Sequence, residues 1–202
     1  MVDQQIIDRG ITDSNVIQAM RIVPRHRFVP DDLADEAYGD HPLPIGHGQT
    51  ISQPYIVAMM SEALGVGPGD RVLEVGTGSG YQAAVLAAMG CEVYTVEIVA
   101  ELASRAEAVL SALGYTVTVA VDDGYYGWEE HGPYDAIIVT AAPDHVPQPL
   151  LDQLKEGGVL VIPVGPIGAV QTMWRFTVDA DGAVTGENLG AVRFVPFTRT
   201  AE

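Results

Sequence analysis

The sequence is poor in cysteine and in long hydrophobic runs, and both shortages limit what the protein can be. Its 202 residues include one cysteine, Cys91, which cannot form a disulfide within the chain. No apolar run reaches the roughly 18 residues of a membrane span. The first residues carry no basic stretch followed by an apolar core, the pattern of a secretory signal. We therefore expect a cytoplasmic protein with no membrane partner.

Positive charge is scarce as well. Ten basic residues, of which only Lys155 is a lysine, stand against 27 acidic ones, giving a net charge of −17. A field of this sign repels phosphate backbones, so we expect no nucleic-acid partner. The simplest explanation is a solvated acidic surface. A second hypothesis is a high-salt habitat, which predicts a melting temperature that rises between low and molar salt.

Motifs for metal binding and for hydrolysis are also missing. The five histidines do not stand at metal-ligand spacing from Cys, Asp or Glu, and there is no C-x-x-C, so no metal is expected. The Gly-x-Ser-x-Gly elbow of serine hydrolases is only partly present, at 78–80. Cys91 opens a predicted strand and fits a small buried hydrophobe better than a nucleophile.

The remaining pattern predicts a single α/β domain. A hydrophobic content of 48% supports a sizeable core. Residues 1–69 predict a helical extension, with one helix capped by Thr12 and another starting at Pro54. Residues 70–165 alternate strands and helices, which predicts a doubly wound, mostly parallel sheet with helices on both faces. Residues 166–202 predict an antiparallel hairpin that turns at 181–182. The expected core strands are 72–75, 93–98, 116–121, 136–140 and 159–164, and the expected helices between them include 81–89, 102–113 and 146–154.

The most informative stretch is 72–81, where an apolar run meets three alternating glycines and then a helical pattern. Glycines let the backbone approach a ligand closely, and the helix start offers unpaired N–H groups. A dinucleotide fingerprint needs glycine where Tyr81 stands, so a nicotinamide oxidoreductase is disfavoured. From Glu74 onward the pattern is Glu-x-Gly-x-Gly-x-Gly, the form seen in S-adenosylmethionine-dependent methyltransferases.

Three acids accompany this loop. Glu97 ends the second predicted strand about 20 residues after the glycines, where a carboxylate accepts hydrogen bonds from ribose hydroxyls; the alternative is an ordinary exposed acid. Asp123 follows the third strand and is placed to accept from an adenine amino group; the alternative is an Asx-turn. Glu74 is expected to order the loop through backbone N–H groups. Together the three predict an adenosyl site at the strand ends.

Ser52 lies just ahead of the second helix. A serine in this place is usually a helix cap. The same position also suits a site for a carboxylate, because a free hydroxyl stands beside the N–H groups of the helix start. Residue chemistry alone leaves both readings open.

The chain closely resembles the protein-L-isoaspartate O-methyltransferase family over almost its whole length. The blocks that carry the resemblance are 9–11, 23–26, 42–46, 49–56, 72–84, 135–143 and 157–165. Asp122 departs from the family, which usually has glycine there, so the turn after the third strand must accommodate a side chain.

The resemblance implies methyl transfer from S-adenosyl-L-methionine to the free α-carboxylate of L-isoaspartyl residues in damaged proteins and peptides, leaving S-adenosyl-L-homocysteine. It implies Ser52 as the catalytic residue. The implied cofactor-binding residues are Ile51, Glu74, Gly76, Thr77, Gly78, Gly80, Glu97, Asp123, Gly124 and Thr198. The implied substrate-binding residues are Ser52, Gln53, Tyr55, Val195 and Pro196.

This chemistry needs few groups, because a carboxylate with a free pKa of about 3–4 is already anionic and requires no general base. We expect a monomer. The alternatives are a methyltransferase acting on another carboxylate or small molecule, and a non-catalytic module that binds the adenosyl compound. The intact block around Ser52 argues against the second alternative, since a sensor needs no substrate serine.

Overall fold

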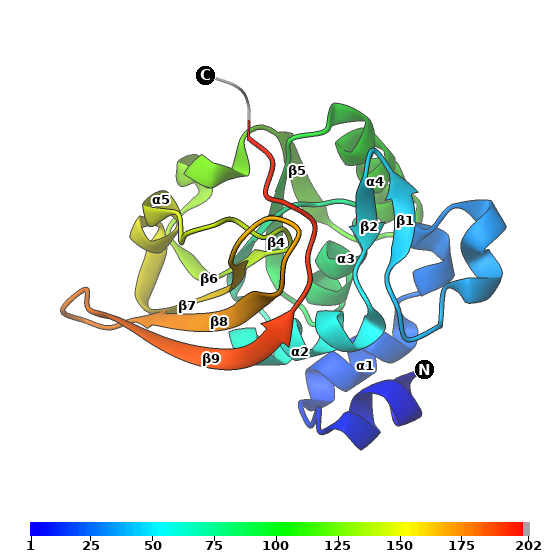
Figure 1. Ribbon diagram of the computed structural model, residues 1–202, viewed down its shortest axis with the longest axis horizontal. Coiled ribbons are helices and arrows are strands. Elements are labelled where there is room, and N and C mark those ends of the chain that lie inside the picture. The colour runs from blue at the N-terminus through cyan, green and yellow to red at the C-terminus, as the bar shows by residue number, and fades with distance from the viewer. Residues whose placement is uncertain (200–202) are drawn as a thin grey trace.

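The computed structural model describes residues 1–199, and a seven-stranded sheet runs through its centre (Figure 1). The strand order is β5-β4-β3-β6-β7-β8-β9. The strands are β3 (Arg71–Val75), β4 (Glu92–Glu97), β5 (Val117–Val121), β6 (Tyr134–Val139), β7 (Leu154–Val164), β8 (Gln171–Val178) and β9 (Val184–Val192). The first five are parallel and the last two join antiparallel, which confirms the predicted mixed sheet.

Helices cover both faces of this sheet, because successive side chains of a strand point to opposite sides. The helices are α1 (Ser14–Ile22), α2 (Pro54–Leu64), α3 (Tyr81–Ala88), α4 (Ala100–Ala112) and α5 (Gln148–Asp152). Residues of α1 to α4 share one core with Val72 and Ile138. Leu150 of α5 lies in a second core with Leu73 and Ile137. The shortest helical turns are Val2–Ile6, Ile7–Arg9, Arg25–Phe28, Asp31–Glu36, Gly124–Tyr126 and Glu129–His131.

The predicted cap of α1 is wrong by one residue. Asp13 caps the helix, and its carboxylate accepts from the backbone N–H groups of Asn15 and Val16. Thr12 is bound elsewhere, since its N–H and hydroxyl both reach Glu62 Oε1, at 2.7 and 3.3 Å. A carboxylate nearer the helix therefore takes the capping role.

Residues 38–53, which show little periodicity in sequence, contain a short hairpin of β1 (Leu43–Gly46) and β2 (Gln49–Ile51). The turn uses left-handed backbone at His47 and Gly48, with φ of 53° and 71°. Strands this short, with proline and glycine inside them, carry no readable alternation. The hairpin lies beside the carboxyl ends of the sheet and brings residues 49–52 there (Figure 1).

The chain after β9 differs most from expectation. The hairpin turn spans 179–183, where Asp179 N–H donates to Ala183 O, and β9 ends at Val192 rather than near residue 195. Residues 193–199, which we call the C-terminal strap, leave the sheet and cross its end (Figure 1, red). Backbone bonds fix the strap: Ala142 N–H donates to Val195 O, and Phe197 N–H donates to Ala142 O.

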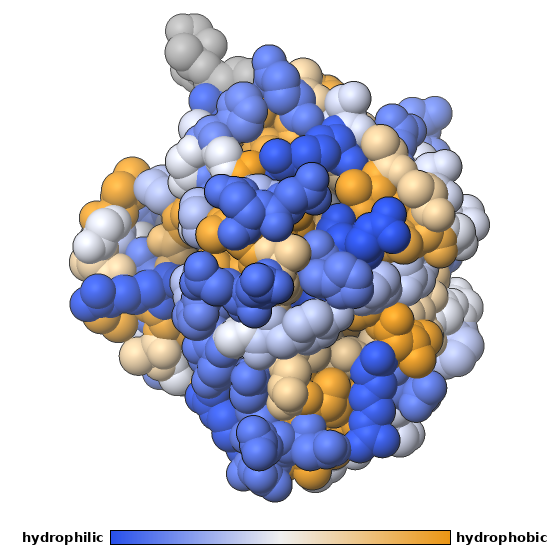
Figure 2. Space-filling view, turned by 90° about the vertical axis from the view of Figure 1, so that its right-hand side faces the viewer, coloured by the Kyte–Doolittle hydropathy of each residue, from blue (hydrophilic) through white to orange (hydrophobic). Residues whose placement is uncertain are grey.

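Other predicted ends of helices and strands differ from the observed ones by a few residues. The helix expected at 146–154 is only α5, and β7 begins at Leu154 instead of 159. Within residues 1–199, no helix combines the length and apolar character needed to cross a membrane. Hydrophilic residues cover most of the face formed by the N-terminal segments, and hydrophobic ones form small separate patches (Figure 2).

Candidate active site

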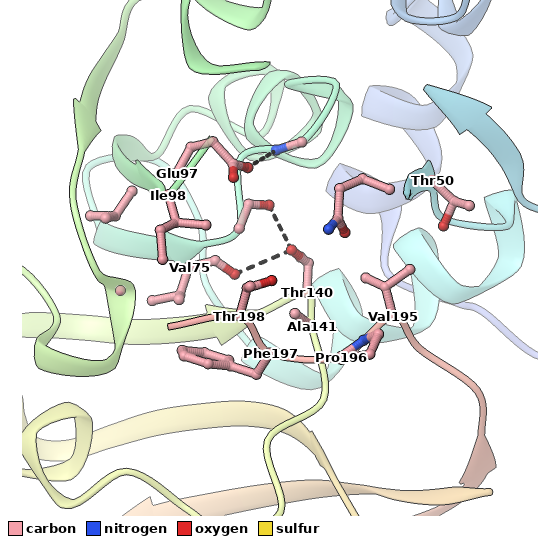
Figure 3. A pocket seen from close by; sticks show the side chains of 15 residues that line it. Thr50, Val75, Glu97, Ile98, Thr140, Ala141, Val195, Pro196, Phe197 and Thr198 are labelled. Atoms are coloured by element: carbon pink, nitrogen blue, oxygen red, sulfur yellow. Dashed lines mark hydrogen bonds between the residues drawn. The ribbon is translucent and has the colours of Figure 1, made fainter. Parts of the chain in front are cut away.

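A cleft opens where β3, β4 and β6 end, and we call it the strand-end cleft (Figure 3). Parallel sheets bind ligands at this edge, beyond the carboxyl ends of the strands. Glu97 and Ile98 lie on one side of the cleft, and Phe197 and Thr198 of the strap lie on the other. The lining residues are Gln49, Thr50, Val75, Gly76, Gly78, Val96, Glu97, Ile98, Gly124, Thr140, Ala141, Val195, Pro196, Phe197 and Thr198.

The glycine loop shapes the floor of this cleft. Gly76 has φ of +98° and its N–H donates to Val96 O, 2.8 Å away. Gly78 lines the cleft without a Cβ to narrow it. Gly80 has another task, because a Cβ there would lie 3.2 Å from Ala106 Cβ on α4. The third glycine therefore allows close helix packing, and it lines none of the three cavities at the strand ends.

Glu97 is anchored to the loop it faces. Its Oε2 accepts from Gly78 N–H at 2.8 Å, and its Oε1 accepts from Val99 N–H at 3.0 Å. The residue is 6% exposed and lines the strand-end cleft (Figure 3). Each carboxylate oxygen has two lone pairs, so both retain capacity for a ligand hydroxyl.

Glu74 is fully buried beneath the loop. Its Oε2 accepts from the Thr95 hydroxyl at 2.5 Å, and that hydroxyl also pairs with the Thr77 hydroxyl at 2.7 Å. The expected bonds to backbone N–H groups are therefore wrong, and two threonine hydroxyls link the acid to the loop. Glu74 Oε1 has no partner. Burial disfavours the charged form and raises the pKa of Glu74 to about 8.

The turn after β5 places Gly124 and Asp123 differently. Gly124 lines the strand-end cleft, and a Cβ there would overlap Val75. Asp123 Oδ1 accepts from Tyr125 N–H at 3.0 Å, which is the Asx-turn alternative, and its Oδ2 pairs with Arg199 at 3.2 Å. Asp122 keeps a negative φ and its Oδ1 accepts from Asp123 N–H, so the turn accommodates this side chain without strain.

A second, larger cavity lies beside the cleft, and we call it the groove. It runs between α2 and the end of β9 with the start of the strap. Its lining residues are Arg9, Pro42, Thr50, Ser52, Gln53, Tyr55, Ile56, Met59, Thr140, Val170, Leu189, Ala191, Val192, Arg193, Phe194 and Val195. Four of the five predicted substrate residues line it, while Pro196 lines the strand-end cleft.

Ser52 stands at the end of this groove nearest the loop. It also lines a third, smaller cavity with Ile51, Glu74 and Thr77. The cap position of α2 is Gln53, which makes no side-chain capping bond. Within the described chain the Ser52 hydroxyl makes no hydrogen bond, so the structure does not support its reading as a helix cap.

Sequence reasoning missed Thr50 and Thr140, which line all three cavities. The Thr140 hydroxyl donates to Gly76 O at 2.6 Å (Figure 3). A signal for Thr140 was present, because it directly follows a buried parallel strand and so falls at the ligand edge of the sheet. Thr50 lies in block 49–56, which carries the family resemblance, but residue spacing gave no signal for it, since the hairpin that carries it was not predicted.

Within residues 1–199, no cluster of three or more His, Cys, Asp or Glu side chains is arranged to hold a metal ion. A glycine loop, a carboxylate at the end of the neighbouring strand and an adjoining groove with a free hydroxyl sit at one edge of a Rossmann-like sheet. The fold and this site define an S-adenosylmethionine-dependent methyltransferase.

The particular family follows from comparison. A family model described as protein-L-isoaspartate(D-aspartate) O-methyltransferase matches residues 1–202, and the chain belongs to that family. The chain is 58% identical over 200 residues to a protein-L-isoaspartate O-methyltransferase of Gloeobacter violaceus, covering 98% of this chain and 97% of the relative. A relative of the same description from Picosynechococcus is 57% identical and is covered over 88% of its length.

Solved structures agree. A protein-L-isoaspartate O-methyltransferase superposes with a TM-score of 0.86 at 31% identity, over 97% of this chain and 65% of its own. A candidate member from Plasmodium falciparum, solved in complex with S-adenosyl-L-homocysteine, has a TM-score of 0.83 at 27% identity, over 98% of this chain and 97% of its own.

Proposed function

We propose that this enzyme transfers a methyl group from S-adenosyl-L-methionine to the free α-carboxylate of L-isoaspartyl residues in damaged proteins and peptides. Family membership and the relatives' activity support the reaction. The observation that carries it is the position of Ser52, whose unbonded hydroxyl lies where the groove meets the glycine loop. The groove supplies room for the substrate chain beside the reacting residue.

The residues of the strand-end cleft fit the cofactor. Gly76 and Gly124 line the cleft at places where a Cβ would overlap Thr140 and Val75, and Glu97 offers acceptors for the ribose hydroxyls. Ile98 and Phe197 offer apolar walls for the adenine. Glu74, whose Oε1 has no hydrogen-bond partner, lines the adjoining cavity, where its carboxyl group fits the ammonium of the amino-acid part. In this proposal Thr198 closes the cleft from the strap side.

When bound, the cofactor supplies a methyl group activated by a positively charged sulfur. Ser52 holds one oxygen of the substrate carboxylate, and the other oxygen takes the methyl group, forming an ester and a neutral thioether. The carboxylate is already anionic, so no side chain needs to accept a proton. A neutral hydroxyl suits the role, because a cation at this oxygen would weaken the nucleophile. Positioning is then the main contribution of the protein, worth on the order of 7–11 kcal/mol in favourable cases.

The proposal assigns a task to each part of the single domain. Residues 1–69 supply Ser52 and one wall of the groove, residues 70–165 supply most of the cofactor cleft, and residues 166–199 supply the opposite wall and the strap. Both cavities are built within one chain, which supports function as a monomer.

The reaction is tested by measuring transfer of a labelled methyl group to an isoaspartyl peptide and to a peptide of the same sequence with a normal aspartyl residue. We expect base-labile label on the isoaspartyl peptide alone, because an ester hydrolyses in base. Equal labelling of both peptides, or label that survives base, would instead indicate the alternative of another carboxylate or another acceptor group.

A further inference from the structure

The charge of the groove is opposite to the charge of the protein. The chain carries 27 acidic and ten basic residues. Among residues 1–199, however, the charged residues that line the groove are Arg9 and Arg193, and both are cationic. A chain with this composition would be expected to place acids on most surfaces, so a groove lined without acids calls for an explanation.

The two arginines are not equivalent. Arg9 is already engaged, because its guanidinium lies 3.5 Å from the centre of the Tyr55 ring and pairs with Asp40 at 3.0 Å. Arg193 directly follows the last residue of β9 and is exposed. Within the described chain its guanidinium makes no hydrogen bond or ion pair. Arg193 is therefore the cation of the groove that is available to a ligand.

We infer that Arg193 is a specificity residue, which favours isoaspartyl substrates with an aspartate or glutamate close to the damaged position. This inference rests on the proposed function. The net charge of −17 repels acidic peptides at long range, so a local cation is needed for them to bind as well as neutral ones. An extended peptide advances about 3.3 Å per residue. A chain seated with its isoaspartyl residue at Ser52 therefore carries its neighbours along the groove wall that contains Arg193.

The expected size of the preference is modest. Exposed ion pairs favour association by an amount that corresponds to about two- to fivefold in KM. The preference falls to near unity at about 1 M salt, where charges further than about 3 Å apart are screened. The effect belongs to KM, because Arg193 does not touch the reacting atoms.

The test uses isoaspartyl peptides that differ only in Glu, Gln or Lys, placed in turn at the three positions before and after the isoaspartyl residue. With the wild-type enzyme we expect Glu to lower KM relative to Gln at one or two adjacent positions, with kcat unchanged. Arg193→Gln is expected to remove this difference, and Arg193→Lys to retain most of it.

The matched control is Arg21→Gln, which makes the same change in net charge on α1, where Arg21 pairs with Asp3 away from the groove. It is expected to preserve the difference between Glu and Gln. The inference is overturned if the wild-type enzyme treats the Glu and Gln peptides alike, or if Arg193→Gln keeps the difference. Failure of the proposed function gives another result, namely no methylation of any isoaspartyl peptide in the series.

Discussion

The Thr140 hydroxyl occupies the space where a side chain at residue 76 would begin. An ideal Cβ on Gly76 would lie 2.5 Å from Thr140 Oγ1, and the same oxygen donates to the Gly76 carbonyl at 2.6 Å. Two neighbouring strands, β3 and β6, are thus joined at their ends by one hydroxyl. Gly76 is required both for its left-handed backbone and for this contact.

Gly76→Ala is accordingly expected to lower the free energy of unfolding by about 1–3 kcal/mol and to weaken S-adenosyl-L-homocysteine binding more than about tenfold. Urea unfolding and calorimetry measure the two effects. Gly114→Ala is the control, because Gly114 also has a positive φ, 79°, but a Cβ there meets nothing within 4 Å. The double variant Gly76→Ala with Thr140→Ala should recover part of the lost stability. If Gly76→Ala and Gly114→Ala lower the free energy of unfolding equally, and Thr140→Ala restores none of it, the Thr140 contact is unimportant.

Ser52→Ala is expected to reduce kcat/KM for an isoaspartyl peptide by about ten- to hundredfold, the value of one hydrogen bond to a charged group. Affinity for S-adenosyl-L-homocysteine should change less than about twofold, because Ser52 does not line the strand-end cleft. Steady-state kinetics and calorimetry separate the two quantities. Ser14→Ala, on the exposed start of α1, is the control. Unchanged turnover in Ser52→Ala would contradict the catalytic assignment.

Periodicity predicted the sheet and most of its helices, since buried parallel strands are continuous apolar runs and amphipathic helices repeat every three to four residues. The β1–β2 hairpin was not predicted, because its strands are too short for a hydrophobic pattern. Spacing alone indicated the glycine loop and Glu97. The contact between Glu74 and Thr95 could not be predicted, because Thr95 lies on another strand and sequence spacing says nothing about the register between strands.

Glu97→Gln is expected to weaken S-adenosyl-L-homocysteine binding by about ten- to hundredfold. Both oxygens of Glu97 accept backbone N–H groups, so an amide nitrogen in place of one oxygen faces a donor and loses that bond. Calorimetry measures the affinity, and the KM for the cofactor should rise more than kcat falls. Glu101→Gln, in the first turn of α4, is the matched control. An affinity equal to that of the control would refute the role of Glu97.

The raised pKa of Glu74 predicts that the stability of the folded protein depends on pH. Its pKa is raised to about 8 in the folded protein, whereas an unfolded glutamate titrates near pH 4.3. Between these values the folded state keeps a proton that the unfolded state has lost, so this group lowers stability as pH rises from about 4.3 to about 8 and adds no further change above that.

Glu74→Gln should remove this slope. We expect it to match the wild type near pH 4 and to exceed it at pH 8 by an amount on the order of a few kcal/mol, measured by urea unfolding across the range. Glu62→Gln is an unsuitable control, because Glu62 binds the N-terminal segment. Glu101→Gln serves instead. Parallel curves for Glu74→Gln and wild type would show that Glu74 is ionised in the folded protein.

The contacts of Arg199 with Tyr125 and Asp123 predict that this residue holds the strap in place. Its guanidinium lies 3.7 Å from the centre of the Tyr125 ring and 3.2 Å from Asp123 Oδ2. Arg199→Gln should lower the stability of the protein only slightly, because the guanidinium is partly solvated. We expect S-adenosyl-L-homocysteine to dissociate several-fold faster, as stopped-flow fluorescence would show. Arg21→Gln again controls for net charge. If S-adenosyl-L-homocysteine dissociates from both variants at the same rate, Arg199 does not hold the strap over the bound ligand.

The strap has a consequence for how the two cavities are connected. Val195 lines both the groove and the strand-end cleft, so one short segment forms a wall common to the two cavities. A change in this segment is therefore expected to alter the binding of the peptide and of the cofactor together.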